Sequence, residues 1–229
     1  MNAKQITAKL KALANPRNVE GMARFGINPE NTLGVSMPEI RKLAKQAGKS
    51  HELAQQLWKT GIHEARIVAG LVDEPAKVTE KQMDSWAKDF DSWDVCDQVC
   101  MNLFDKTSFA YKKAVEWSSR EEEFVKRAGF ALTACLAVHD KKAGDEKFLA
   151  FLPAIKRSAT DDRNFVKKAV NWALRQIGKR NKRLNAAALK TAKEIQKLDS
   201  KTAKWIAADA IKELESKAAR LKTSRTRFE

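Results

Sequence analysis

The chain has 229 residues, 43% of them hydrophobic, so it is long and apolar enough to bury a sizeable core. Its 44 Lys and Arg against 29 Asp and Glu give a formal charge of +15, which indicates attraction to a polyanion. Nucleic acid is the commonest such partner, and an anionic membrane surface is the alternative. This composition excludes a wholly disordered chain, and the lack of a run of about 18 apolar residues excludes a bilayer-spanning helix. The N-terminus has no apolar signal-peptide core, so we expect a cytoplasmic protein.

In chain order, the first predicted helix covers residues 4–14 and is ended by Asn15-Pro16, and a short second helix covers Val19–Phe25. After a loop, a third helix is predicted from residue 36 to about Gly48. Further along, apolar residues recur at intervals of three and four rather than two, and Gly and Pro are scarce. We therefore predict an all-α chain of about a dozen helices. Capping-box spacings occur at Ser36–Glu39, Thr79–Gln82 and Ser119–Glu122.

Three helical segments resemble one another: Phe124–Ala128, Phe165–Ala169 and, less closely, Ala203–Ala207. Their spacing is near 40 residues, the period of HEAT-like repeats, although chance similarity among Ala/Lys-rich helices is the alternative. We predict a HEAT-like helical solenoid with a concave basic face, a single domain over residues 1–215, and a mobile basic tail over residues 216–229.

One helix start, near residue 93, carries an acidic and aromatic cluster. On a helical wheel Trp93 and Asp97 lie side by side at the edge of a buried stripe formed by the apolar residues and cysteines of this helix. Asp91 or Ser92 is predicted to cap the helix, and Asp94 to interact with its dipole. Asp97 lies a turn deeper and gains less from either effect. It is the carboxylate for which a functional role is predicted.

A second aromatic residue lies on the polar side of its helix. Trp172 falls outside the apolar face, among Lys168, Arg175 and Lys179. An indole with cations around it offers a stacking surface beside a nucleic acid, with the charges placed to bind phosphates. The alternative is an indole packed under a neighbouring helix or under the lysine stems.

Arg127 presents the opposite pattern, a cation on a helix that is apolar nearly all round. Its guanidinium needs either a phosphate or a structural Asp or Glu partner, and the sequence leaves both open. The histidines His51, His63 and His139 lie near helix ends and are interpreted as incidental. The cysteines Cys96, Cys100 and Cys135 are interpreted as core residues with reduced thiols. No P-loop, dinucleotide-binding turn or metal motif occurs, so we predict no cofactor and no metal.

Several sequence segments follow one another in an order and at intervals that are typical of one protein family. The chain resembles the AlkD-type DNA alkylation repair glycosylases over roughly residues 5–215. The segments that carry the resemblance are Met22–Phe25 with Leu33–Arg41, then Ser92–Asp97, Phe124–Ala128 and Phe165–Arg175.

The resemblance implies a monofunctional glycosylase that excises positively charged N3- and N7-alkylated purines, such as 3-methyladenine and 7-methylguanine, from duplex DNA in base excision repair. It implies catalytic roles for Trp93, Asp97 and Trp172, with Arg127 assisting. It also implies work on the exposed backbone, without a pocket for a flipped base. The residues expected to contact DNA are Phe25, where the family has a Tyr, and Arg41, together with the cations around Trp172, which are Lys168, Arg175 and Lys179.

Two other functions stay open from the sequence. One is a non-catalytic protein that binds DNA or RNA of unusual backbone shape, and the other is a protein-interaction scaffold. We expect a monomer in each case. Base release from methylated duplex separates the first function from these two.

Overall fold

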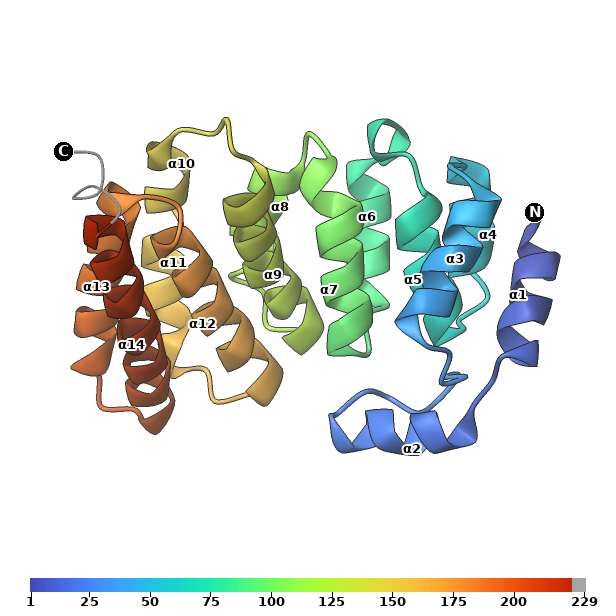
Figure 1. Cartoon of the computed structure of the whole chain (residues 1–229), viewed down its shortest axis with the longest axis horizontal. Helices are drawn as coiled ribbons and strands as arrows, with labels where there is room; N and C mark the ends of the chain where they lie inside the picture. Colours follow the sequence, from blue (N-terminus) through green and yellow to red (C-terminus); the bar gives the residue numbers. More distant parts are fainter. Residues whose placement is uncertain (224–229) are drawn as a thin grey trace. The chain divides into compact units, whose positions relative to one another are not determined.

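The described chain is entirely helical. The computed structural model describes residues 1–223, with side chains up to Ser216, and this part contains no strand. The predicted all-α class is thereby confirmed. The chain divides into two compact units, unit 1 over Met1–Phe109 and unit 2 from Ala110 onward, both drawn in Figure 1. The single domain predicted for residues 1–215 stays a prediction.

Unit 1, blue to green in Figure 1, is a series of short helices. The two predicted N-terminal helices are present, and the second begins earlier than expected, at Pro16. In Figure 1, α2 runs across the direction of α3, α4 and α5, and it has no fully buried residue. The elements of unit 1 are α1 (Ala3–Ala12), α2 (Pro16–Arg24), α3 (Met37–Ala47), α4 (His51–Trp58), α5 (His63–Val72), the 3₁₀ turn η1 (Pro75–Lys77), α6 (Glu80–Lys88), α7 (Trp93–Asn102) and the 3₁₀ turn η2 (Phe104–Lys106).

The predicted helix caps have a mixed outcome. The hydroxyl of Thr79 accepts a hydrogen bond from the backbone N–H of Gln82 at 3.1 Å, as a capping residue does. Ser36 precedes α3 but makes no side-chain cap. The capping box predicted from Ser119 is wrong, because its hydroxyl donates to the carbonyl of Glu116 in the preceding helix. Ser and Thr hydroxyls have this choice between caps and local carbonyls, which limits what spacing alone can predict.

Aromatic stacking joins α4 to α6 in the core of unit 1. The rings of Trp58 and Trp86 lie 3.9 Å apart and nearly parallel, and the Trp58 indole N–H donates to Asp89 at 2.8 Å. Large rings packed this way contribute both buried area and orientation. Trp58 and Asp89 are 31 residues apart, a separation that recurs in unit 1 because each helical pair stacks on the preceding one.

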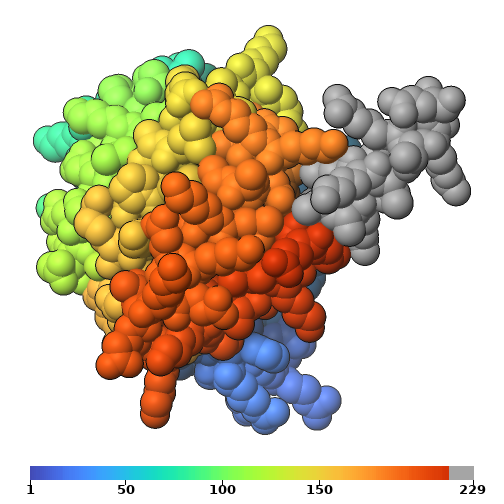
Figure 2. All heavy atoms as spheres, turned by 90° about the vertical axis from the view of Figure 1, so that its left-hand side faces the viewer, coloured from blue at the N-terminus to red at the C-terminus, as the bar shows by residue number. Residues whose placement is uncertain are grey.

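Unit 2 has longer helices, and α9, α12 and α14 pack in succession. Figure 2 shows its outer face, where α13 (orange) and α14 (red) cover the surface. Gly129 of α9 permits close packing against the end of α8, since a Cβ there would lie 2.8 Å from the carbonyl carbon of Trp117. The elements are α8 (Ala110–Trp117), α9 (Glu123–His139), α10 (Asp145–Leu149), α11 (Leu152–Arg157), the 3₁₀ turn η3 (Ser158–Thr160), α12 (Asn164–Gly178), α13 (Lys182–Gln196) and α14 (Lys201–Thr223).

The sequence repeats correspond to structural repeats in unit 2. The three self-similar segments form the first turns of α9, α12 and α14. Side-chain hydrogen bonds then join residues 38 positions apart, Arg127 to Phe165, Asn171 to Asp209 and Arg175 to Glu213. This constant offset is what stacked repeats produce.

The predicted mobile tail begins inside a helix. Helix α14 continues past Ser216 to Thr223, and residues 224–229 lie outside the described residues. The side chains of Cys96, Cys100 and Cys135 are buried and in the reduced form, as the interpretation of these residues as core requires.

Candidate functional site

Helix α7 carries the carboxylate and the indole predicted to be catalytic. Val95 and Val99 are fully buried, while Trp93 and Asp97 are half-buried at the edge of this stripe, as the helical wheel predicts. The Trp93 indole N–H donates to the backbone carbonyl of Phe25 at 3.1 Å. This bond orients the ring and ties the end of α2 to the start of α7.

Phe25 is the most exposed large hydrophobic residue in the described part of unit 1, at 75%. It follows the last residue of α2, and the chain turns directly after it at Gly26, which has a φ of +77°. Because the bond from Trp93 fixes the Phe25 backbone, its exposed ring is suited to stacking on a base or to insertion between two bases of a nucleic acid. Arg41, on α3, is also exposed.

The two residues before α7, Asp91 and Ser92, make no side-chain cap for this helix. Ser92 is buried, and its hydroxyl accepts from the backbone N–H of Asn28 at 2.9 Å. Asp91 accepts from the side chain of Asn28 at 3.2 Å. The prediction that Asp91 or Ser92 caps α7 is therefore wrong for the side chains. Both residues fix the loop after α2 instead.

Asp94 has a role that its position in the first turn did not reveal. Its Oδ2 lies 2.9 Å from Nε2 of His63, which is 4% exposed at the start of α5. Burial lowers the pKa of His63, but the hydrogen bond to Asp94 and the negative charges of Asp94, Glu64 and Asp91 together raise it above its ordinary value. His63 therefore joins α5 to α7 through Asp94, and its interpretation as incidental to catalysis stays a prediction.

Glu64 fixes the loop before α3 from the adjacent position. Its carboxylate is fully buried and accepts the backbone N–H groups of Leu33, Gly34 and Val35 at 2.7 to 3.2 Å. Gly34 has a φ of +76°, and a Cβ there would lie 3.0 Å from that of Asn18 in α2. The Asn18 side chain also donates to the Gly34 carbonyl at 2.8 Å, so α2 is held close to this loop.

These residues surround a cavity of about 620 Å³, entirely within unit 1. Helix α2 contributes one side, and α3, α5 and α7 contribute the others. Phe25, His63, Glu64, Trp93 and Asp94 all line it. The family resemblance implies a site without a pocket for a flipped base. The structure places a cavity beside Trp93.

Arg127 and Trp172 belong to unit 2. Arg127 is 5% exposed in α9, and its Nη1 donates to the backbone carbonyl of Phe165 at 2.7 Å. The aromatic rings of Phe124 and Phe165 stack nearby at 5.5 Å. This carbonyl is a further partner, beside the phosphate or carboxylate between which the sequence leaves the choice open. Trp172 is half-buried on α12.

The cations of α12 differ from one another. Lys168 is exposed. Arg175 lies 2.7 Å from Glu213 and 3.3 Å from Asp209 on α14, and Lys179 also pairs with Glu213. Any phosphate bound by Arg175 or Lys179 therefore competes with a carboxylate of the same chain.

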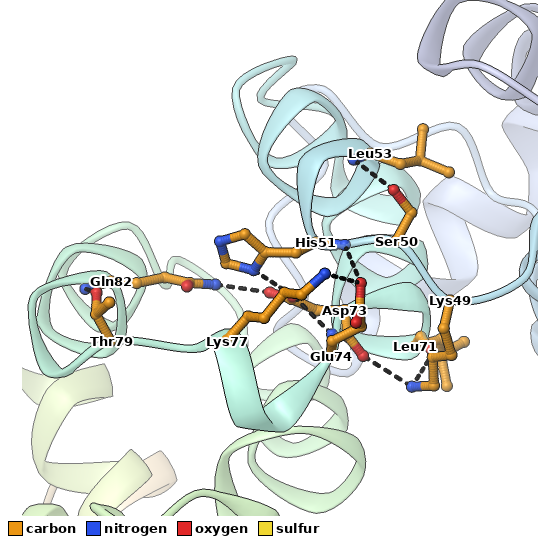
Figure 3. Close-up of polar contacts among 10 residues, drawn as sticks. All are labelled: Lys49, Ser50, His51, Leu53, Leu71, Asp73, Glu74, Lys77, Thr79 and Gln82. Atoms are coloured by element: carbon orange, nitrogen blue, oxygen red, sulfur yellow. Dashed lines mark hydrogen bonds and ion pairs between the residues drawn. The ribbon is translucent and has the colours of Figure 1, made fainter.

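A second titratable cluster, shown in Figure 3, surrounds Asp73 at the end of α5. This carboxylate is fully buried, its Oδ1 lies 2.7 Å from Nδ1 of His51, and it accepts from the side chain of Gln82 at 2.7 Å. Lys49 caps the end of α5 by donating to the carbonyls of Leu71 and Asp73. These contacts join helices α4, α5 and α6, so the cluster is interpreted as structural.

Two findings bear on cofactors and membranes. Among the described residues, no group of three His, Cys, Asp or Glu side chains could hold a metal ion. Over the same part of the chain, no helix is both long and apolar enough to cross a bilayer.

Comparison with known proteins gives a family. Residues 6–214 match the family described as DNA alkylation repair enzyme. A solved structure described as "a new family of proteins related to the HEAT-like repeat DNA glycosylases with affinity for branched DNA structures" superposes with a TM-score of 0.79, covering 94% of this chain and 95% of that one at 24% identity. An uncharacterized protein of Listeria innocua is 22% identical over 198 residues, 85% of this chain and 86% of the relative. The structural match shows a HEAT-like fold, and since the family match covers nearly the whole chain, this protein belongs to the DNA alkylation repair enzyme family.

Proposed function

We propose that this protein is a DNA glycosylase that excises positively charged N3- and N7-alkylated purines from duplex DNA. The observation that carries the proposal is the pair Trp93 and Asp97, half-buried on one edge of α7 in a chain of the DNA alkylation repair enzyme family. Their positions match those to which the family resemblance assigns catalysis.

The chemistry fits these two side chains. When the bond between C1′ and the alkylated base breaks, its electron pair goes to the base and neutralises the positive charge, so the leaving group needs no proton. The sugar is left as an oxocarbenium ion. The Asp97 carboxylate stabilises this cation and orients the water that attacks C1′, whose proton then passes to the carboxylate or to solvent. The Trp93 ring adds a face of negative electrostatic potential.

The family resemblance also assigns roles to Trp172 and Arg127, which belong to unit 2. Trp172 offers a second aromatic face on α12, and Arg127 binds a phosphate beside the lesion. The Arg127 guanidinium is nearly buried, and its bond to the Phe165 carbonyl fixes its orientation before DNA binds. Phe25, Arg41 and Lys168 are exposed and bind the DNA backbone directly, while Arg175 and Lys179 contribute with Glu213 beside them.

Release of free base from duplex DNA containing 7-methylguanine or 3-methyladenine tests the proposal. We expect single-turnover release by the parent protein and a loss of roughly 100-fold or more in Asp97→Asn, as for removal of one electrostatic group from a transition state. DNA affinity should change little in this variant. Asp105→Asn, a carboxylate variant in η2 outside the proposed site, serves as the control. Equal rates for the parent and Asp97→Asn would refute the assignment.

A second function is favoured by a specific observation. The solved structure that covers 94% of this chain is described as having affinity for branched DNA structures. In this alternative, the basic chain binds four-way or three-way DNA junctions more tightly than linear duplex and releases no base. Gel-shift competition at fixed salt, run on the same protein preparation as the base-release assay, separates the two.

A further inference from the structure

Trp205, near the start of α14, leaves much of its indole ring in solvent. It is 45% exposed, and no other aromatic residue in the described part of unit 2 is exposed to this degree. A buried indole contributes a large hydrophobic gain, which this ring forgoes in part. A single exposed apolar residue is common on protein surfaces, so the neighbours of the ring decide what it does.

One of these neighbours is a lysine of α12. Nζ of Lys167 lies over the Trp205 ring, 5.7 Å from its centroid, in a cation–π contact. This contact is the first of three that join α12 to α14 at every fourth residue, with a constant offset of 38 residues. The three contacts are Lys167 with Trp205, Asn171 with Asp209 and Arg175 with Glu213. The helix packing that pairs the polar residues therefore also places Lys167 at Trp205.

The first contact differs from the other two in its charge. At the second and third contacts, a carboxylate of α14 accepts a hydrogen bond from α12. At the first, the α14 residue is a neutral ring, and Lys167 forms no ion pair within the described part of the chain. The interface therefore keeps an unneutralised positive charge beside Trp205, whereas Glu213 neutralises the cations further along.

Cations predominate along this part of the two helices. Helix α12 has no acidic residue. The acidic residue in the first three turns of α14 is Asp209, which is bound by side chains of α12. Asp199, before α14, pairs with Lys204 at 3.7 Å, and both side chains are exposed, so water screens this pair. The exposed lysines beside Lys167 and Trp205 are Lys168, Lys201 and Lys204.

An unpaired base of DNA fits an indole with lysines around it. In a duplex each base is covered by its neighbours, whereas an unpaired base at a strand end offers a free face for stacking. The lysines bind the phosphates on either side. An exposed cation–π contact is weaker than base stacking, so a base displaces the Lys167 ammonium from the ring and frees it for a phosphate. An acidic peptide would use the lysines and leave the ring without a role.

We propose that Trp205 and Lys167 form a stacking platform for an unpaired DNA base next to a duplex, with the exposed lysines beside them binding the adjoining phosphates. Lys168 lies one turn before Trp172 on α12, so the platform adjoins the surface proposed to meet duplex DNA. The inference goes beyond the proposed function, since it requires no base release. It also differs from junction binding, because a fully paired four-way junction has no unpaired base.

Fluorescence anisotropy at fixed salt tests the platform with one labelled duplex that carries a short overhang, either of thymidines or of abasic nucleotides. The two overhangs have the same phosphates, so a difference between them reports the bases, and each is placed at the 5′ end and at the 3′ end. We expect the parent to bind the thymidine overhang at least about fivefold more tightly at one of these ends, the lower range for stacking one base. Trp205→Ala should abolish this difference, and Trp205→Phe should keep most of it.

Two controls separate stacking from charge. Val115→Ala truncates an exposed apolar residue of α8 and should keep the parent's difference between the overhangs. Lys167→Gln should weaken binding of both overhangs, and more than Lys182→Gln, which makes the same charge change at an exposed position of α13.

Three results would overturn the inference. They are equal binding of the two overhangs by the parent at both strand ends, an unchanged difference in Trp205→Ala, and equal competition by an acidic peptide of matched charge, which has no base to stack. The comparison of overhangs on the parent needs no variant, so it decides the matter even if Trp205→Ala does not fold.

Discussion

Nε2 of His63 lies 2.9 Å from Oδ2 of Asp94, and this pair joins the first turns of α5 and α7 beside the cavity. His63 is 4% exposed, so the pair is largely shielded from solvent. An ion pair so placed is strong only while the imidazole is protonated. The packing of α5 on α7 is therefore coupled to pH.

The first prediction concerns this coupling. The pKa of His63 is raised in the folded protein, burial lowering it and Asp94, Glu64 and Asp91 raising it more. A raised pKa means that the folded state binds the proton more tightly, so the contribution to stability is complete below the unfolded pKa of about 6.5 and is lost as pH rises through the folded pKa. We expect the free energy of unfolding of the parent to exceed that of His63→Gln by a margin that shrinks from pH 6 to pH 9.

Urea unfolding at several pH values measures this margin. Asp94→Asn removes the partner and should flatten the same part of the pH profile. A margin between parent and His63→Gln that stays constant over this range would show that the imidazole does not change its charge there.

The second prediction concerns the buried carboxylate of Glu64. Oε1 of Glu64 accepts all three N–H groups of Leu33, Gly34 and Val35, and Oε2 accepts that of Leu33 as well. Gln keeps one oxygen but removes the charge that strengthens these bonds and turns an NH₂ group toward the Leu33 N–H, at a cost of about 1–3 kcal/mol. We expect amide hydrogen exchange of these three residues to accelerate in Glu64→Gln. Glu30→Gln removes an exposed carboxylate from the same loop and should leave their exchange unchanged. Similar exchange in both variants would mean that Glu64 does not hold the loop.

The third prediction concerns the cations of α12. Burial raises the pKa of Glu213, but Lys179 and Arg175 lower it below its ordinary value, so this carboxylate is ionised at neutral pH and neutralises two cations. Glu213→Gln should release Lys179 for phosphates and leave Arg175 paired with Asp209 alone. We expect duplex affinity to rise by roughly threefold to tenfold, with a steeper dependence on salt as further phosphates are contacted.

Fluorescence anisotropy with a short duplex at several salt concentrations measures this effect. Glu215→Gln makes the same charge change at an exposed position of the same helix. If the two variants gain affinity equally, the gain comes from net charge alone, and α12 does not contact DNA.

Much of the fold could be predicted from local patterns. Intervals of three and four between apolar residues gave the all-helical class, and the segments at Phe124 and Phe165 gave the repeat, because both signals lie within one helix or its copy. The half-buried positions of Trp93 and Asp97 followed from the wheel of α7. These are properties of single helices.

The contacts that build the site could not be predicted in this way. His63 and Asp94 are 31 residues apart, and Arg175 and Glu213 are 38 apart, so each pair depends on the register in which helices stack. The donation from Arg127 to the carbonyl of Phe165 has no side-chain signature at all. The cavity is formed by residues of four helices, α2, α3, α5 and α7, and of the loop that Glu64 holds. Once the repeat offset is known, 31 residues in unit 1 and 38 in unit 2, a residue's candidate hydrogen-bond partner can be sought one repeat away in the sequence.

The fourth prediction contrasts two glycines inside helices. At Gly129 of α9 an added Cβ would lie 2.8 Å from the carbonyl carbon of Trp117 and closer still to the backbone nitrogen of Ser118, atoms that cannot rotate away. At Gly21 of α2 it would meet nothing within 4 Å. We expect Gly129→Ala to lower the free energy of unfolding by about 1–3 kcal/mol through overpacking. Gly21→Ala should raise it by about 0.5–1 kcal/mol through helix propensity.

Urea unfolding followed by far-UV circular dichroism, with hydrogen exchange of the α8 and α9 amides, measures both effects. The two substitutions are chemically identical and both glycines are helical, so a difference of opposite sign reports only their surroundings. If Gly129→Ala were as stable as the parent, the end of α8 would have to move away from α9 at little cost.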